Sequence, residues 1–85
     1  MLVFGASWCK RCAELAPFCT GLAAKMVEEA AFASVDIDEA EELVAEYGVT
    51  AVPHLVVLRD GVKVAAYRGS ATDELEAVVV RAVRG

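Results

Sequence analysis

The sequence predicts an α/β domain in which a four-stranded mixed sheet is flanked by helices. Short apolar or alternating segments, which are typical of strands, lie between longer segments whose apolar residues recur at helical spacing. The first half reads strand, helix, strand, and this order implies a parallel pair joined by a right-handed crossover. The second half contains a hairpin signal, which adds antiparallel strands. The length of 85 residues predicts one domain, residues 1–85, with a single modest core.

The first two elements are a strand over residues 1–6 and a helix that begins near Cys9. The strand segment is short and apolar, as expected for a buried strand, and Ser7 is a suitable helix-start residue. Apolar side chains recur at helical spacing as far as about Glu29, where the helix is expected to end. Pro17 is expected to kink this helix rather than end it, because the apolar period continues past it. The predicted buried stripe consists of Leu15, Phe18, Cys19, Leu22 and Met26.

The remaining elements complete the order βαβαββα. Residues 32–38 alternate apolar and polar side chains and predict a strand, and Gly48 ends a short helix. Arg59-Asp60-Gly61 is a hairpin signal between two strands, and Thr72 is a suitable N-cap for a final helix. The predicted ranges after the first helix are 32–38, 40–47, 55–58, 62–68 and a helix from residue 72. The residues expected to face inward from that last helix are Leu75, Val78, Val79 and Ala82.

Composition narrows the class of protein. The net charge of −5 disfavours nucleic acid and anionic membranes as partners, and the acids between Asp36 and Glu46 are expected to form a solvated helical face. No apolar run reaches the roughly 18 residues that span a bilayer, and no signal peptide is expected. Three cysteines are too few, and odd in number, for a disulfide scaffold. A reducing compartment, the cytoplasm, is therefore expected, although the abrupt start leaves a longer precursor open.

The segment Trp8-Cys9-Lys10-Arg11-Cys12 carries the candidate chemistry. Two cysteines three apart at the start of a helix can close a disulfide with little backbone movement, and the first lies where free N–H groups and the helix dipole stabilise a thiolate. Lys10 and Arg11 add positive charge, and sites of this kind lower the pKa of a cysteine from about 8.5 to roughly 3.5–7.5. The thiolate is the attacking form, so the pattern predicts thiol–disulfide exchange. Cys9 is the expected nucleophile, and Cys12, expected to be less exposed, resolves the mixed disulfide.

The order and spacing of several motifs resemble the thioredoxin superfamily over nearly the whole chain. The matching positions are Phe4, Trp8–Cys12, Pro17, Val35-Asp36-Ile37-Asp38, Tyr47-Gly48-Val49, Val52-Pro53, Gly61 and Gly69. The resemblance implies a thioredoxin-like fold in a minimal form, without the strand and helix that begin the family's full-length members. The face that this helix normally covers would be exposed, and such exposure favours self-association, so a monomer or a weak homodimer is expected.

The resemblance also implies a protein-disulfide reductase and assigns its binding residues. The Val52–Pro53 peptide bond would be cis and lie beside the cysteines, and the backbone of Val52 would pair with the substrate chain like an added strand. Trp8 would lie on the contact surface, although a packing role stays open. His54 either tunes the thiolate and accepts a proton or is a partly solvated residue at a strand start. Cys19, on the apolar stripe, is expected to be a buried, inert thiol.

Two departures from the family pattern bear on the chemistry. Typical members have Gly-Pro where this chain has Lys10-Arg11, and the two cations are expected to raise the reduction potential above about −270 mV. Many members have a buried aspartate where this chain has Val3, so exchange is expected to be slower or to use another proton acceptor. No metal or organic cofactor is expected, because only Cys19 and His54 remain as ligands. The expected partners are disulfide-containing proteins and an external reductase or dithiol donor. A glutathione-dependent, glutaredoxin-like reductase and a non-catalytic binding module stay open.

Overall fold

A computed structural model describes residues 1–84, and its elements follow the predicted order. In chain order they are β1 (Leu2–Gly5), α1 (Lys10–Lys25), β2 (Ala33–Asp36), α2 (Glu41–Glu46), β3 (His54–Arg59), β4 (Val62–Arg68) and α3 (Thr72–Arg84). Within this part of the chain, none of the helices has the length and apolar character needed to cross a bilayer.

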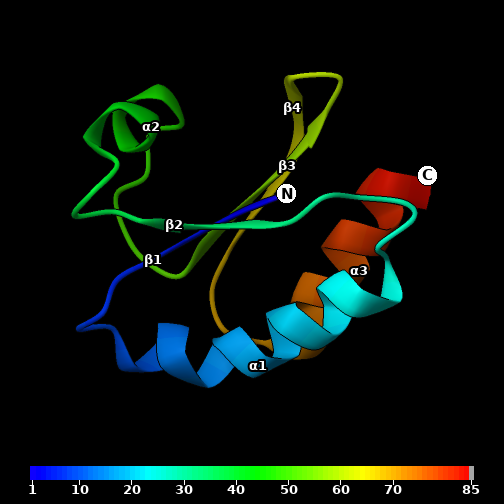
Figure 1. Cartoon of the computed structure of the whole chain (residues 1–85), viewed down its shortest axis with the longest axis horizontal. Helices are drawn as coiled ribbons and strands as arrows, with labels where there is room; N and C mark the ends of the chain where they lie inside the picture. Colours follow the sequence, from blue (N-terminus) through cyan, green and yellow to red (C-terminus); the bar gives the residue numbers. More distant parts are fainter. Residues whose placement is uncertain (85) are drawn as a thin grey trace.

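The predicted four-stranded mixed sheet is confirmed, with the strand order β2-β1-β3-β4. The β1 and β2 strands are parallel, whereas β3 is antiparallel to both β1 and β4. Phe4, in the centre of the sheet, is paired with Val35 on one side and His54 on the other. Helices α1 and α3 lie together beside the sheet, and α2 lies apart from them (Figure 1). Because β1 and β2 are parallel, their carboxyl ends meet at one edge, where α1 also begins.

Two apolar clusters hold the helices onto the sheet. The larger joins α1 and α3 to β3 and includes Leu22, Leu55 and Val79. The smaller is built on Phe4 and Val56, and side chains of α2 pack against it. Each face of the sheet is therefore covered by apolar contacts, and the removal of this area from water is the main favourable term in folding.

The first helix begins where predicted but ends earlier. It ends at Lys25 rather than near Glu29, and Met26 is the C-cap, with its N–H donating to the carbonyl of Leu22 at 3.0 Å. Met26 is only 2% exposed, so the chain turns into the core there, and the next apolar residue, Val27, is 73% exposed. At the other end, the predicted start near Cys9 is confirmed, and Cys9 rather than Ser7 is the N-cap.

Other boundaries shift by a residue or two. The helix α1 continues through Pro17, as predicted, and the predicted kink stays a prediction. Strand β2 is shorter than residues 32–38. Thr72 is the first residue of α3 rather than its N-cap, because the first helical hydrogen bond runs from the N–H of Leu75 to the carbonyl of Ala71. Leu75 and Val79 are buried as predicted, whereas Val78 and Ala82 are half-buried.

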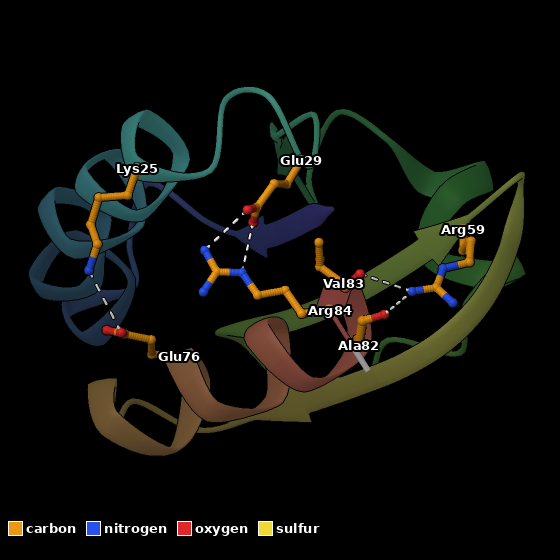
Figure 2. A network of polar contacts seen from close by, with 7 residues as sticks. All are labelled: Lys25, Glu29, Arg59, Glu76, Ala82, Val83 and Arg84. Atoms are coloured by element: carbon orange, nitrogen blue, oxygen red, sulfur yellow. Dashed lines mark hydrogen bonds and ion pairs between the residues drawn. The ribbon is translucent and has the colours of Figure 1, made fainter.

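Two arginines fasten the end of α3 to the rest of the molecule, as Figure 2 shows. The guanidinium of Arg59, at the end of β3, donates to the carbonyls of Ala82 at 2.6 Å and Val83 at 3.1 Å. Arg84 makes a two-bond contact with the carboxylate of Glu29, at 3.0 and 3.2 Å. A positive charge at the C-terminus of a helix is favourable because the last carbonyls carry partial negative charge.

Candidate active site

Cys9 and Cys12 form a disulfide at the N-terminus of α1, with their Cα atoms 5.3 Å apart. Cys9 has an extended backbone, at φ −89° and ψ 110°, and its sulfur accepts a hydrogen bond from the N–H of Cys12 at 3.2 Å. Its carbonyl accepts from the N–H of Ala13, also at 3.2 Å. Cys9 is thus the last residue before the helix, with its sulfur turned onto the first free N–H groups, and this position stabilises a negative charge on that sulfur.

The two cysteines differ in exposure, in the opposite sense to the prediction. Cys9 is buried, with 9% of its surface exposed, whereas Cys12 is half-buried. The reason lies in β1. Gly5 has no side chain, and a Cβ atom at that position would lie 3.4 Å from both the Cβ and the Sγ of Cys12. The space that a larger residue would fill is part of a groove of about 390 Å³ that Cys12 lines.

Trp8 is on the surface beside the disulfide, with 66% of its area exposed. One edge of its ring is held, because the indole N–H donates to a carboxylate oxygen of Asp38 at 3.0 Å. The N–H of Asp38 in turn donates to the side chain of Asp36 at 2.9 Å. This exposure argues against the packing role and in favour of a contact surface.

The contact between Asp38 and Trp8 is one that the sequence prediction missed, because Asp38 was placed in a strand and in a family motif, and the acids from Asp36 onward were given no functional role. A usable signal was present. Asp38 follows β2, and the carboxyl ends of the parallel strands β1 and β2 lie at the same edge of the sheet. A polar residue just after β2 therefore lies close to the loop that follows β1, where Trp8 is found.

The Val52–Pro53 peptide bond is cis, as the resemblance implied. Pro53 is buried and lines the same groove as Cys12, so the two lie close together; Val52 is half-buried. The carbonyl of Pro53 accepts a hydrogen bond from the N–H of Gly69 at 3.4 Å. Gly69 has φ +141°, and a Cβ there would lie 2.9 Å from the hydroxyl of Tyr67. Glycine is therefore required for the chain to pass this close to Pro53.

His54 is buried, with 7% of its surface exposed, so the expectation of a partly solvated residue is wrong. Among the described residues its Nδ1 atom has no hydrogen-bond partner. Burial lowers the pKa of His54, and the positive charges of Arg68 and Lys63 lower it further. His54 is paired with Phe4 across the sheet and their rings are in edge contact, at 6.1 Å between centroids. Its ring therefore lies on the face of the Phe4 cluster, opposite α1.

Lys10 and Arg11 are both exposed in the first turn of α1, which contains no acidic residue. Neither forms an ion pair within residues 1–84. Their charge is consequently not neutralised locally, and it acts on the disulfide that they separate. Cys19 is a free, buried cysteine, as predicted, and burial raises the pKa of its thiol. In the described part of the chain no group of three or more acids, cysteines or histidines is placed to hold a metal ion.

The comparison with known proteins identifies the family. The family model described as Thioredoxin matches residues 1–81. The chain belongs to the thioredoxin family. It is 37% identical to Thioredoxin H4 of Arabidopsis thaliana over 78 residues, which is 92% of this chain and 66% of that protein.

Solved thioredoxin structures agree closely with this fold. The Fasciola hepatica thioredoxin superposes with a TM-score of 0.89 at 38% identity, over 94% of this chain and 76% of that one. The germline-specific thioredoxin Deadhead of Drosophila melanogaster gives a TM-score of 0.91 at 31% identity, with the same coverage. The thioredoxin-like fold is therefore confirmed. The chain spans 61% to 66% of the length of the first curated relatives it matches.

Proposed function

We propose that the chain is a thiol–disulfide oxidoreductase that reduces disulfides in partner proteins. The observation that supports this best is the Cys9–Cys12 pair at the N-terminus of α1, bordered by the exposed ring of Trp8 and by the cis Pro53. The names of the curated relatives, which are thioredoxins, point the same way.

In the proposed cycle, the thiolate of Cys9 attacks one sulfur of the target disulfide. A mixed disulfide forms, and the other target sulfur leaves as a thiolate. The thiolate of Cys12 then attacks the sulfur of Cys9, which closes the Cys9–Cys12 disulfide and releases the second target sulfur. Two electrons have moved from the chain to the target. An external reductase or dithiol donor returns them, and neither a metal nor an organic cofactor takes part.

The groups around the pair have supporting roles in this proposal. Trp8 offers an aromatic contact, and the backbone of Val52, before Pro53, pairs with the substrate chain as an added strand. Lys10 and Arg11 stabilise the reduced thiolate, which makes the couple more oxidising than about −270 mV.

His54 is buried on the sheet face opposite α1, so a tuning role for it would act through the strands. The small number of cysteines supports action in a reducing compartment, the cytoplasm, where electron transport through such dithiols maintains redox homeostasis. The face that lacks its covering helix supports a monomer or weak homodimer.

Reduction of insulin by the dithiothreitol-driven protein tests this function. We expect the wild type to accelerate the reaction and Cys9→Ser to abolish the acceleration, because the attacking thiolate is lost. Cys19→Ser is the matched control, since it makes the same chemical change at a buried thiol outside the pair. Equal rates for the wild type and Cys9→Ser would favour the binding module. Turnover that depends on glutathione would favour the glutaredoxin-like alternative.

A further inference from the structure

A carboxylate faces Cys12 across the space that Gly5 leaves open. Gly5 and Asp36 are paired in the parallel register of β1 and β2, and paired residues of neighbouring strands have their side chains on the same face of the sheet. A Cβ at Gly5 would lie 3.4 Å from the Sγ of Cys12, so this face is the one toward α1. The ends of β1 and β2 and the start of α1 lie at the same end of the molecule (Figure 1). The side chain of Asp36 therefore points toward Cys12 from the next strand, about 4.8 Å beyond Gly5.

The groove described above joins the same two residues. Cys12 and Asp36 both line it, whereas Cys9 does not. Asp36 is half-buried, and one oxygen of its carboxylate accepts the N–H of Asp38 at 2.9 Å, which fixes its orientation. Within residues 1–84 no cation forms an ion pair with it. Its negative charge is therefore not neutralised locally, and it acts on Cys12 more strongly than on Cys9 because a Coulomb interaction weakens with distance.

Among the described residues, no other charged side chain lines this groove. The nearby charged residues of α1 and of the loop after β2 lie outside it; they are Lys10, Arg11, Glu14 and Asp38. The β1 strand presents no titratable group there, and His54 of β3 is on the opposite face of the sheet. Cys19 lines the groove, but burial raises the pKa of its thiol and keeps it uncharged at neutral pH. Asp36 is thus the charge that Cys12 faces in the groove.

The two cysteines of the pair lie in fields of opposite sign. The N-terminus of α1 favours a thiolate on Cys9, whose sulfur accepts the N–H of Cys12 at 3.2 Å. A carboxylate beside a thiol disfavours the thiolate, since like charges repel. The proposed cycle needs this difference, because Cys9 must be ionised to attack the target whereas Cys12 attacks only in the second step. While Cys12 remains protonated, the mixed disulfide with the target persists.

We propose that Asp36 keeps Cys12 in its thiol form at neutral pH, so that Cys9 alone is ionised and the mixed disulfide with the target is prolonged. The proposal rests on the function proposed above, because it concerns the second step of that cycle. In that step Cys12 loses its proton to water, and its thiolate bonds to the sulfur of Cys9. The bond between Cys9 and the target breaks, and the target sulfur leaves as a thiolate. Asp36 forms none of these bonds and acts only through its charge on Cys12.

The ionisation of Cys12 can be measured by itself. In a variant that carries both Cys9→Ser and Cys19→Ser, Cys12 is the single thiol, and the pH dependence of its alkylation by iodoacetamide gives the midpoint of its titration. Adding Asp36→Asn removes the charge but keeps an oxygen that can accept the N–H of Asp38. We expect this change to lower the Cys12 midpoint by roughly 0.5–1 pH unit. An unchanged or raised midpoint overturns the proposal.

Three further variants in the same background control this measurement. Asp36→Glu keeps the charge and should leave the Cys12 midpoint close to its starting value. Asp60→Asn makes the same change of net charge in the exposed hairpin at the far end of β3, so it should leave the midpoint unchanged. Equal shifts in Asp36→Asn and Asp60→Asn would show an effect of net charge alone and refute the role of Asp36. If Asp36→Asn does not fold, Asp36→Ser replaces it, because serine is neutral and its hydroxyl also accepts a nearby N–H.

The release step supplies a readout that a merely structural role of Asp36 would not produce. Reduced protein that retains both cysteines attacks 5,5′-dithiobis(2-nitrobenzoate) through Cys9, and the attack of Cys12 then releases the second thionitrobenzoate in a unimolecular phase. Asp36→Asn should accelerate this phase roughly two- to fourfold at about pH 6–7, because more Cys12 is ionised. The gain should vanish above about pH 10, because a more acidic thiol gives a weaker nucleophile. Slower release at neutral pH overturns the proposal.

Insulin reduction by the wild type separates this proposal from the function on which it rests. Its absence refutes the protein-disulfide reductase. Its presence, together with a Cys12 midpoint that does not fall in Asp36→Asn, refutes only the role of Asp36.

Discussion

Replacing Gly69 with alanine should be among the most damaging single-methyl changes in this protein. Gly69 has φ +141°, a region that residues with a side chain rarely adopt, and strain of this kind costs about 1–3 kcal/mol. A Cβ there would also lie 2.9 Å from the hydroxyl of Tyr67, which donates to Glu74 at 2.9 Å, so the ring cannot move without breaking that bond. If the backbone shifts instead, the hydrogen bond to the carbonyl of Pro53 is lost, at about 0.5–1.5 kcal/mol. We expect a total loss of about 2–4 kcal/mol.

Gly48→Ala is the matched control for this prediction. Gly48 also has positive φ, at +62°, but a Cβ there would meet nothing within 4 Å. Its replacement should cost only the left-handed backbone, about 1–2 kcal/mol. Urea unfolding of the two variants and the wild type measures both values. If Gly69→Ala is no more destabilising than Gly48→Ala, the close contact with Tyr67 carries no energetic weight and the reasoning is wrong. Insulin reduction should fall in Gly69→Ala alone, because only this glycine is bonded to Pro53.

Three further predictions concern single side chains. Arg59→Gln should destabilise the fold by about 1 kcal/mol in urea unfolding, since the last carbonyls of α3 lose two hydrogen bonds from a cation. Arg81→Gln, which removes a cation from the last turn of the same helix without breaking a hydrogen bond within residues 1–84, should cost less. Burial lowers the pKa of His54 below its ordinary 6.5, so the unfolded chain binds the proton more tightly. Stability should be full above about pH 6.5 and fall as the pH drops below it, and unfolding curves of His54→Asn should lack this loss. In the native protein Cys19 should react with iodoacetamide far more slowly than a free cysteine, because burial raises the pKa of its thiol and blocks access. In urea it should react at an ordinary rate. Equal rates in the native and the urea-unfolded protein would show that the thiol is not protected.

The sequence predicts those features that depend on neighbours in the chain. The order of elements along the chain, the parallel pair joined by a helix and the hairpin all follow from local periodicity and from Gly61, and they agree with the structure. The end of α1 does not follow in this way. The apolar pattern continues to Val27, but Met26 is buried by residues of distant strands and helices, and that burial turns the chain. The N-cap residue likewise depends on the folded backbone, because Cys9 rather than Ser7 has the extended conformation that precedes the helix.

The exposure of Cys12 depends on a contact between distant elements. From the helix alone, a residue one turn inside is expected to be better covered than the residue at the cap. What covers Cys12 is β1, and Gly5 offers it no side chain. Asp38 was missed for a comparable reason, because its bond to Trp8 joins residues 30 positions apart. The sequence pattern identifies the reactive residues, but the residues that contact them from other elements depend on how the strands are paired.

Val3 and the groove bear on one further requirement of the proposed cycle. Before Cys12 can attack the mixed disulfide it must lose a proton, since the thiolate is the attacking form. Val3 has no group that can accept that proton, and His54 lies on the sheet face opposite α1. The groove instead opens Cys12 to solvent along the side where Val3 lies. This opening exposes the side of the resolving residue to water, so a variant that closes the groove, such as Ala16→Leu, should slow the release of the target.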